Sequence, residues 1–195
     1  QLVHHYVDLY AQTMIDGYDQ KGARFRYLFS RLRETACAIV ENIADEMAVS
    51  DFRPIAFELG FGADGQLPAV TIREAGEELS VRGKVDRVDG WIKDGKLYLR
   101  VVDYKTGQKA FDLSDVRYGL GIQMLLYLFA LQKEGSGYFG MPVVPAGVLY
   151  TPAREIISRE DRSIPPEKLE AVLRRKLRRT GMLLSEPEVL RAMEH

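Results

Sequence analysis

The dipeptide Asp94-Gly95 stands between two segments rich in β-branched and aromatic residues, 81–92 and 97–104. An Asp-Gly pair in this setting is the strongest short signal for a two-residue β-hairpin turn. Such a turn fixes the register of the two strands, because Lys93 must face Lys96 and every further pair follows from that one. The dipeptide therefore predicts both a hairpin and the partner of each residue in it.

The register also predicts which side chains share a face of the hairpin. One face is mixed and one is apolar, and the facing pairs on each are favourable cross-strand neighbours. The mixed face pairs Trp91 with Tyr98 and Asp89 with Arg100, and the apolar face pairs Ile92 with Leu97 and Val88 with Val101. We expect a sheet covered by helices on the apolar side.

Continued further, the same register sets Asp86 opposite Asp103 on the apolar face, with Lys105 two residues beyond. Facing Cβ atoms lie about 5 Å apart, where like charges are destabilising. Two half-buried carboxylates there need a cation, and Mg²⁺, or Mn²⁺ in its place, is commonly held by one or two carboxylates plus a substrate phosphate. The alternative is a structural Asp–Lys pair at a strand end.

A metal ion between carboxylates is suited to phosphodiester hydrolysis, because it neutralises charge on the phosphate and helps to activate water. Lys105 would then orient or deprotonate the water, or balance charge on the phosphate. These roles stay open at the level of the sequence.

Three other polar residues are candidates for the same site. Glu58 lies between Phe57 and Leu59, which is unusual for a glutamate. It is either a further acid at the metal site or an outward-facing residue whose two neighbours share the opposite face. Gln123 and Tyr127 share one helix face. They are either directed at the substrate or at the lysine, or they are a core tyrosine and a glutamine with satisfied hydrogen bonds.

Composition excludes several function classes. The single Cys37 rules out an internal disulfide framework or a cysteine-cluster metal site, and it indicates a core thiol in a reducing, cytoplasmic protein. A net charge of −1 argues against a dedicated non-specific nucleic-acid binder. No apolar run reaches the length of a membrane span. The basic run 174–179 is either a solvated face or a DNA-backbone contact, and His4 and His5 are expected at the surface.

The remaining pattern predicts further helices and strands. Apolar residues at steps of three and four predict a helix over 25–47 with one buried face. The other elements expected are strands at 55–61 and 70–73 followed by a loop at 74–78, a helix over 115–132 capped by Ser114 and ending near Gly135, a strand at 143–150, and helices at 167–179 and 187–193. Because the sequence opens at Gln1 inside a helical pattern, we expect a fragment of a longer protein.

Three segments in this order carry a family resemblance: Gly83 to Asp89, Val102 to Lys105, and Gln123 to Tyr127. Together they resemble the RecB-like branch of the PD-(D/E)XK nucleases, and within it the B subunits of bacterial AddAB-type ATP-dependent helicase/nucleases. The likeness runs from about residue 25 to the C-terminus.

The resemblance implies an α/β (α+β) fold of the restriction-endonuclease type, with a central mixed β-sheet flanked by helices. It implies one nuclease domain over 1–195, with a core of 23–151 and a C-terminal helical extension of 152–195. Asp86 and Asp103 would be metal ligands with the Tyr104 carbonyl, Lys105 would be catalytic, and Gln123 and Tyr127 would be auxiliary. Family members are metal-dependent DNA exonucleases that process double-strand-break ends for recombinational repair, together with an AddA-type helicase partner.

Two departures from the family pattern concern the isolated chain. The family's upstream histidine ligand has no match at His4 or His5, and its four cysteines for an iron–sulfur cluster are reduced here to Cys37. The fragment is therefore expected to lack the cluster and to be weakly active or inactive. The alternatives are a catalytically incomplete nuclease-fold module for DNA binding or subunit docking, and a different nuclease of this fold, such as a CRISPR-associated exonuclease or a restriction enzyme.

Overall fold

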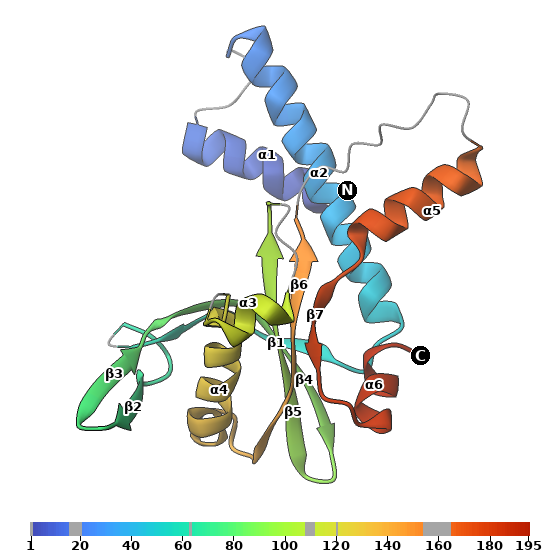
Figure 1. The fold of residues 1–195 in the computed structure, drawn as a ribbon. Helices are drawn as coiled ribbons and strands as arrows, with labels where there is room; N and C mark the ends of the chain where they lie inside the picture. Colours follow the sequence, from blue (N-terminus) through green and yellow to red (C-terminus); the bar gives the residue numbers. More distant parts are fainter. Residues whose placement is uncertain (1, 16–20, 63, 108–111, 120, 154–164) are drawn as a thin grey trace. The chain divides into compact units, whose positions relative to one another are not determined.

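The computed structural model describes residues 2–15, 21–62, 64–107, 112–119, 121–153 and 165–195 (Figure 1). Contacts along the chain divide it into two units, one formed by 1–48 with 152–178 and the other by 49–151 with 179–195. The first unit contains the helices α1 (Leu2–Ile15), α2 (Ala23–Ala48) and α5 (Pro166–Leu177). No helix within the described ranges is long and apolar enough to cross a lipid bilayer.

The second unit is built on a five-stranded sheet in the order β1-β4-β5-β6-β7. Its strands are β1 (Arg53–Phe61), β4 (Gly83–Lys93), β5 (Lys96–Lys105), β6 (Val143–Pro152) and β7 (Thr180–Leu183). The pairs β1–β4, β4–β5 and β6–β7 are antiparallel. β5 and β6 point the same way in Figure 1 and are joined through helix α4 (Gln123–Phe139). The predicted mixed sheet flanked by helices is confirmed.

The β4–β5 hairpin has the predicted turn and register. Asp94 and Gly95 adopt φ angles of 49° and 70°, the left-handed pair that a tight hairpin turn requires. The facing pairs are the predicted ones, from Lys93 with Lys96 through Trp91 with Tyr98 and Asp89 with Arg100 to Arg87 with Val102. The rings of Trp91 and Tyr98 lie 5.3 Å apart between centroids.

Helix α4 covers the predicted apolar face of the hairpin. Its buried side chains Met124, Leu128 and Leu131 pack in one cluster with buried residues of the sheet. The sheet residues include Leu59, Val85, Val88, Leu97, Leu99 and Val101. This cluster is the main hydrophobic core of the second unit. It fixes the face on which Asp103 and Lys105 lie, because side chains alternate along β5 from the fully buried Val101.

The mixed face is buried as well, which the sequence did not predict. Helix α6 (Pro187–Met193) packs there against Phe52, Trp91 and Tyr98. Beside this cluster, the Asp89 carboxylate is 0% exposed and pairs with Arg100 and Arg87, whose nearest nitrogen atoms each lie 2.8 Å from its oxygens. Alternation predicts the face of a residue but not what covers that face.

The predicted helix over 115–132 is two helices. Helix α3 (Leu113–Arg117) begins after Asp112, whose side chain accepts the backbone N–H of Ser114, so Asp112 rather than Ser114 is the N-cap. Gly119 and Gly121 have φ angles of 76° and 67°, which no α-helix contains, and α4 starts only after them. At its other end α4 continues past Gly135 to the left-handed Gly140.

Three further expectations need correction. The loop predicted at 74–78 is the turn of a second hairpin, between β2 (Val70–Glu74) and β3 (Glu77–Val81). The predicted buried face of α2 is mostly exposed or half-buried, with Phe29 the buried residue on it, and Cys37 on that helix is half-buried. The stretch 152–195, expected to be helical, contains β7, which extends the sheet beside β6.

The buried charges on the mixed face yield a test of stability. Asp89→Asn removes the negative charge that two buried guanidinium groups share, and we expect a loss of about 3–5 kcal/mol in the free energy of unfolding. Glu78→Gln, the same kind of change in the exposed Arg73–Glu78 pair, should cost less than about 1 kcal/mol. Urea denaturation of both variants measures the difference, and equal losses would contradict this account of the core.

Candidate active site

The predicted acidic and basic side chains gather at the end of the β4–β5 hairpin that lies away from its turn. Asp86 precedes the last regular β4–β5 pair, which joins Arg87 to Val102. Asp103 and Lys105 follow Val102 on the neighbouring strand. The structure therefore brings Asp86, Asp103 and Lys105 to one end of the hairpin, whereas the direct facing of Asp86 and Asp103 lies beyond the last regular pair and stays a prediction.

The Asp86 side chain links the two strands where their regular pairing ends. Its Oδ2 accepts the backbone N–H of Tyr104 at 2.9 Å. The Asp86 carboxylate is therefore hydrogen-bonded to the backbone of β5 at the residue that directly follows Asp103. The hydrogen bond holds the Asp86 carboxylate beside the backbone that carries Asp103, while one of its oxygens remains for another partner.

Asp103 and Lys105 form an ion pair on the α4 face. Nζ of Lys105 lies 2.7 Å from Oδ2 of Asp103, and the lysine and aspartate side chains are 38% and 20% exposed, respectively. That oxygen is shielded from solvent and makes no hydrogen bond of normal geometry. The Lys105 ammonium compensates the charge of this buried oxygen and so offsets the cost of taking a carboxylate out of water.

These donors fit a hard divalent cation. Asp86 and Asp103 offer carboxylate oxygens, which Mg²⁺ and Mn²⁺ accept, and Mg²⁺ usually keeps several water ligands. Among the residues that the structure describes, no three histidine, cysteine or acidic side chains converge. Two carboxylates would therefore have to suffice, with the Tyr104 carbonyl as the further predicted ligand. The Tyr104 side chain itself is engaged elsewhere, because its hydroxyl accepts a hydrogen bond of 2.8 Å from Arg87.

Glu58 lies on β1, the strand next to β4, between Phe57, which pairs with Arg87, and Leu59, which pairs with Val85. Its carboxylate forms an ion pair with Lys84, and this hydrogen bond, followed by the charge of Glu58, raises the pKa of Lys84. The charge of Asp86 adds a smaller upward contribution, so all three groups are electrostatic neighbours. Both members of the ion pair are largely exposed. A role for Glu58 at the metal stays a prediction.

The backbone at Glu58 departs from strand geometry. Its φ is 52°, a left-handed value that is rare for a glutamate. The neighbours Phe57 and Leu59 are 62% and 1% exposed, so they do not share a face as the structural alternative for Glu58 assumed. Glu58 itself is largely exposed, as that alternative assumed, but its neighbours differ because strict alternation does not pass through a left-handed residue.

Gln123 and Tyr127 bond to each other at the start of α4. The amide Nε2 of Gln123 donates to the Tyr127 hydroxyl at 2.7 Å. The tyrosine ring is buried and stacks on Phe61 at 5.7 Å. A Cβ at Gly83 would lie 2.0 Å from the Tyr127 oxygen, so the glycine is what lets this hydroxyl reach the start of β4. The pair supports the strand that carries Asp86, and an auxiliary catalytic role stays a prediction.

Tyr150 is a neighbour of the site that sequence reasoning missed. The ring lies with its centroid 5.2 Å from Nζ of Lys105, and its hydroxyl donates to the Gly121 carbonyl at 3.4 Å. Burial raises the pKa of Tyr150, the charge of Lys105 opposes that shift and the charge of Asp103 adds to it. The available signal was topological, since a helix after β5 returns the chain as a parallel strand beside it.

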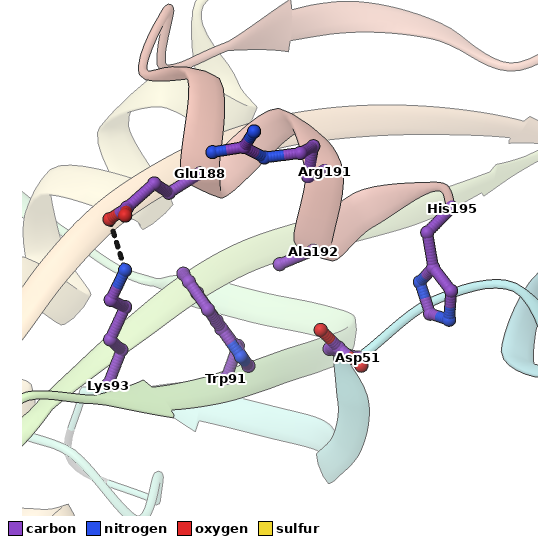
Figure 2. Close-up of a pocket in the computed structure, with 7 residues that line it drawn as sticks. All are labelled: Asp51, Trp91, Lys93, Glu188, Arg191, Ala192 and His195. Atoms are coloured by element: carbon purple, nitrogen blue, oxygen red, sulfur yellow. Dashed lines mark hydrogen bonds and ion pairs between the residues drawn. The ribbon is translucent and has the colours of Figure 1, made fainter.

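A shallow recess of about 290 Å³ lies on the opposite, α6 side of the sheet (Figure 2). In Figure 2 the Lys93 ammonium meets the Glu188 carboxylate, a hydrogen bond that raises the pKa of Lys93 and lowers that of Glu188. The lining residues are Asp51, Trp91, Lys93, Glu188, Arg191, Ala192 and His195. Its acidic and basic groups are balanced, so it offers no basic track for a nucleic acid and is not part of the candidate site.

The remaining predicted surface groups lie in the other unit or at its boundary. His4 and His5 are both exposed on α1, as expected. Arg175, Lys176 and Arg178 of the basic run are exposed and Arg179 is half-buried, whereas the Arg174 side chain lies outside the described ones. Contact between this run and DNA stays a prediction.

Comparison with known sequences gives one family and one group of relatives. The model of the PD-(D/E)XK nuclease superfamily matches residues 2–193. The chain is similar to the B subunit of the ATP-dependent helicase/deoxyribonuclease of Acetivibrio thermocellus, with 39% identity over 172 residues that cover 88% of this chain and 15% of the relative. The protein of the same name from Caldanaerobacter subterraneus subsp. tengcongensis is 37% identical over 194 residues, which cover 96% of this chain and 17% of the relative.

The chain thus spans only a small part of these relatives. The protein of that name from Ruminiclostridium cellulolyticum is 32% identical over 196 residues, and there too the aligned part is 17% of the relative. The activities in these names therefore belong to much longer proteins.

Cation binding is the direct test of the site. Asp103→Asn keeps the size of the side chain but removes its charge, and we expect Mn²⁺ to bind at least about 10-fold more weakly, since even partners of metal ligands change affinity by that factor. The matched control is Asp94→Asn in the hairpin turn, where asparagine tolerates the left-handed φ of 49°. Calorimetric titration with MnCl₂ measures both, and unchanged affinity in Asp103→Asn would remove this aspartate from the site.

Proposed function

This chain belongs to the PD-(D/E)XK nuclease superfamily, and on that premise we propose that it is the metal-dependent nuclease module of a longer helicase/nuclease protein. The observation that carries the proposal is the group of Asp86, Asp103 and Lys105 at one end of a hairpin. Asp86 is fixed there by the Tyr104 amide, and Asp103 by an ion pair with Lys105. Phosphodiester hydrolysis needs two kinds of group together. Carboxylates bind the divalent metal ion, and a positively charged side chain contacts the phosphate.

Each residue has a defined task in this proposal. Asp86 and Asp103 hold Mg²⁺, or Mn²⁺ in its place, which supplies Lewis-acid neutralisation of charge on the phosphate. Lys105 donates a hydrogen bond to a phosphate oxygen beside Asp103, a role that its 2.7 Å contact with that carboxylate supports. The Gln123–Tyr127 pair holds the start of β4, and with it the backbone that presents Asp86.

The biological setting is part of the same proposal. Relatives at 32–39% identity are named as the B subunit of an ATP-dependent helicase/deoxyribonuclease. We infer that the longer protein works with an AddA-type helicase partner and degrades DNA ends during recombinational repair of double-strand breaks. A chromosomal substrate also agrees with the cytoplasmic location expected from the single Cys37.

The proposal is tested by cleavage of linear double-stranded DNA in the natural full-length protein with its helicase partner. Lys105→Ala should lower kcat by at least about 100-fold, because loss of one preorganised charge-stabilising group has that effect. The control Lys96→Ala removes an exposed lysine at the other end of the same hairpin and should leave kcat unchanged.

Two results separate the proposal from its alternative. Cleavage that requires Mg²⁺ and is lost in Lys105→Ala supports the nuclease assignment. Cleavage that is equal in wild type and variant, or absent from both while DNA is still bound, would favour a catalytically incomplete module for DNA binding or subunit docking.

A further inference from the structure

We propose that Tyr150 is a positioning residue of this site, whose ring holds the Lys105 ammonium and whose hydroxyl makes a secondary contact with the turn that leads into α4. The inference rests on the proposed nuclease function and adds a residue to it. Tyr150 acts through Lys105 and does not itself need to touch the substrate.

The first line of evidence is the position of the ring. Nζ of Lys105 lies 5.2 Å from the centroid of the Tyr150 ring, within the range in which an ammonium is attracted to an aromatic face. The same nitrogen lies 2.7 Å from the Asp103 carboxylate. A lysine side chain is long and flexible. Contact with both groups restricts its end to a small volume that neither group would define alone.

The second line of evidence is how firmly the ring is held. Tyr150 continues β6 directly after Val148 and Leu149, which are both buried in the sheet's unit. Across the strand pair its backbone faces Thr180 of β7. Because β6 is hydrogen-bonded between β5 and β7, the ring has a rigid base from which to contact the end of β5.

The third line of evidence is the hydroxyl. It donates to the carbonyl of Gly121, a residue with a left-handed φ of 67° just before α4. Gln123, two residues later, donates to Tyr127, whose hydroxyl sits against Gly83 on β4. One tyrosine therefore ties the lysine on β5 to the turn from which the Gln123–Tyr127 pair starts. A side chain that only filled the core would need neither contact.

The test compares two substitutions in the full-length protein with its helicase partner. Tyr150→Leu removes ring and hydroxyl, and we expect kcat to fall by about 10-fold or more with KM nearly unchanged, as for a misplaced catalytic group. Tyr150→Phe keeps the ring and should restore kcat to within about 3-fold of wild type. Tyr138→Leu, which removes an exposed tyrosine of α4, is the control and should have wild-type kcat.

A second measurement does not depend on activity. Lys105 should react faster with acetic anhydride in Tyr150→Leu than in wild type or Tyr150→Phe, as measured by mass spectrometry of digests. Lys96 in the same digests should react equally in all variants. This pattern would show that the ring, rather than the general stability of the fold, restrains the lysine.

The outcomes distinguish this inference from the function on which it rests. If wild type cleaves DNA, Lys105→Ala does not, and Tyr150→Leu has wild-type kcat or leaves Lys105 labelling unchanged, then the positioning role is wrong and the nuclease assignment stands. If the wild-type protein does not cleave DNA at all, both the nuclease assignment and the positioning role of Tyr150 are wrong. Loss of kcat in Tyr150→Phe equal to that in Tyr150→Leu would also overturn the role of the ring.

Discussion

The register of the β4–β5 hairpin is the constraint on which the rest of the second unit depends. A shift by one residue would move every side chain of one strand to the other face. Val101 would then leave the core under α4, and Arg100 would enter it. The buried Asp89 opposes such a shift, because its carboxylate is satisfied only where Arg100 faces it. The turn and this buried ion pair, at different points along the hairpin, therefore specify the same alignment.

The two ends of the β4–β5 hairpin differ in the regularity of their backbone, and the irregular end is the one that carries the candidate active site. Toward the turn, pairing is regular, and Leu97 is buried on the α4 face, although its partner Ile92 is 61% exposed. At the other end Asp86 replaces a backbone acceptor for the Tyr104 amide, Glu58 on the neighbouring strand is left-handed, and Gly83 yields space to a tyrosine hydroxyl. Irregular backbone is costly and tends to be kept where it presents functional groups. The irregularities here surround Asp86 and Asp103.

Local chemistry explains which parts of this structure were predictable. The hairpin and its register followed from two turn residues, and α6 was predicted with the bounds that the structure shows, beginning at Pro187. The split between α3 and α4 was missed because Gly119 and Gly121 were read within an apolar helical pattern, although their left-handed angles end it. The burial of Asp89 and the place of Tyr150 depend on which elements come to lie beside them, and that information is not local in the sequence.

Electrostatics reconciles a chain of net charge −1 with the proposed DNA substrate. At the site the Glu58 and Lys84 charges cancel, and the two aspartates against one lysine leave an excess negative charge that would repel a phosphate. A divalent cation bound by Asp86 and Asp103 reverses that sign, because its charge exceeds the excess it meets. On the proposed function, attraction for the DNA backbone at this site would therefore depend on the bound cation. A weakly acidic protein could in this way act on DNA at the end of the hairpin that carries Asp86 and Asp103.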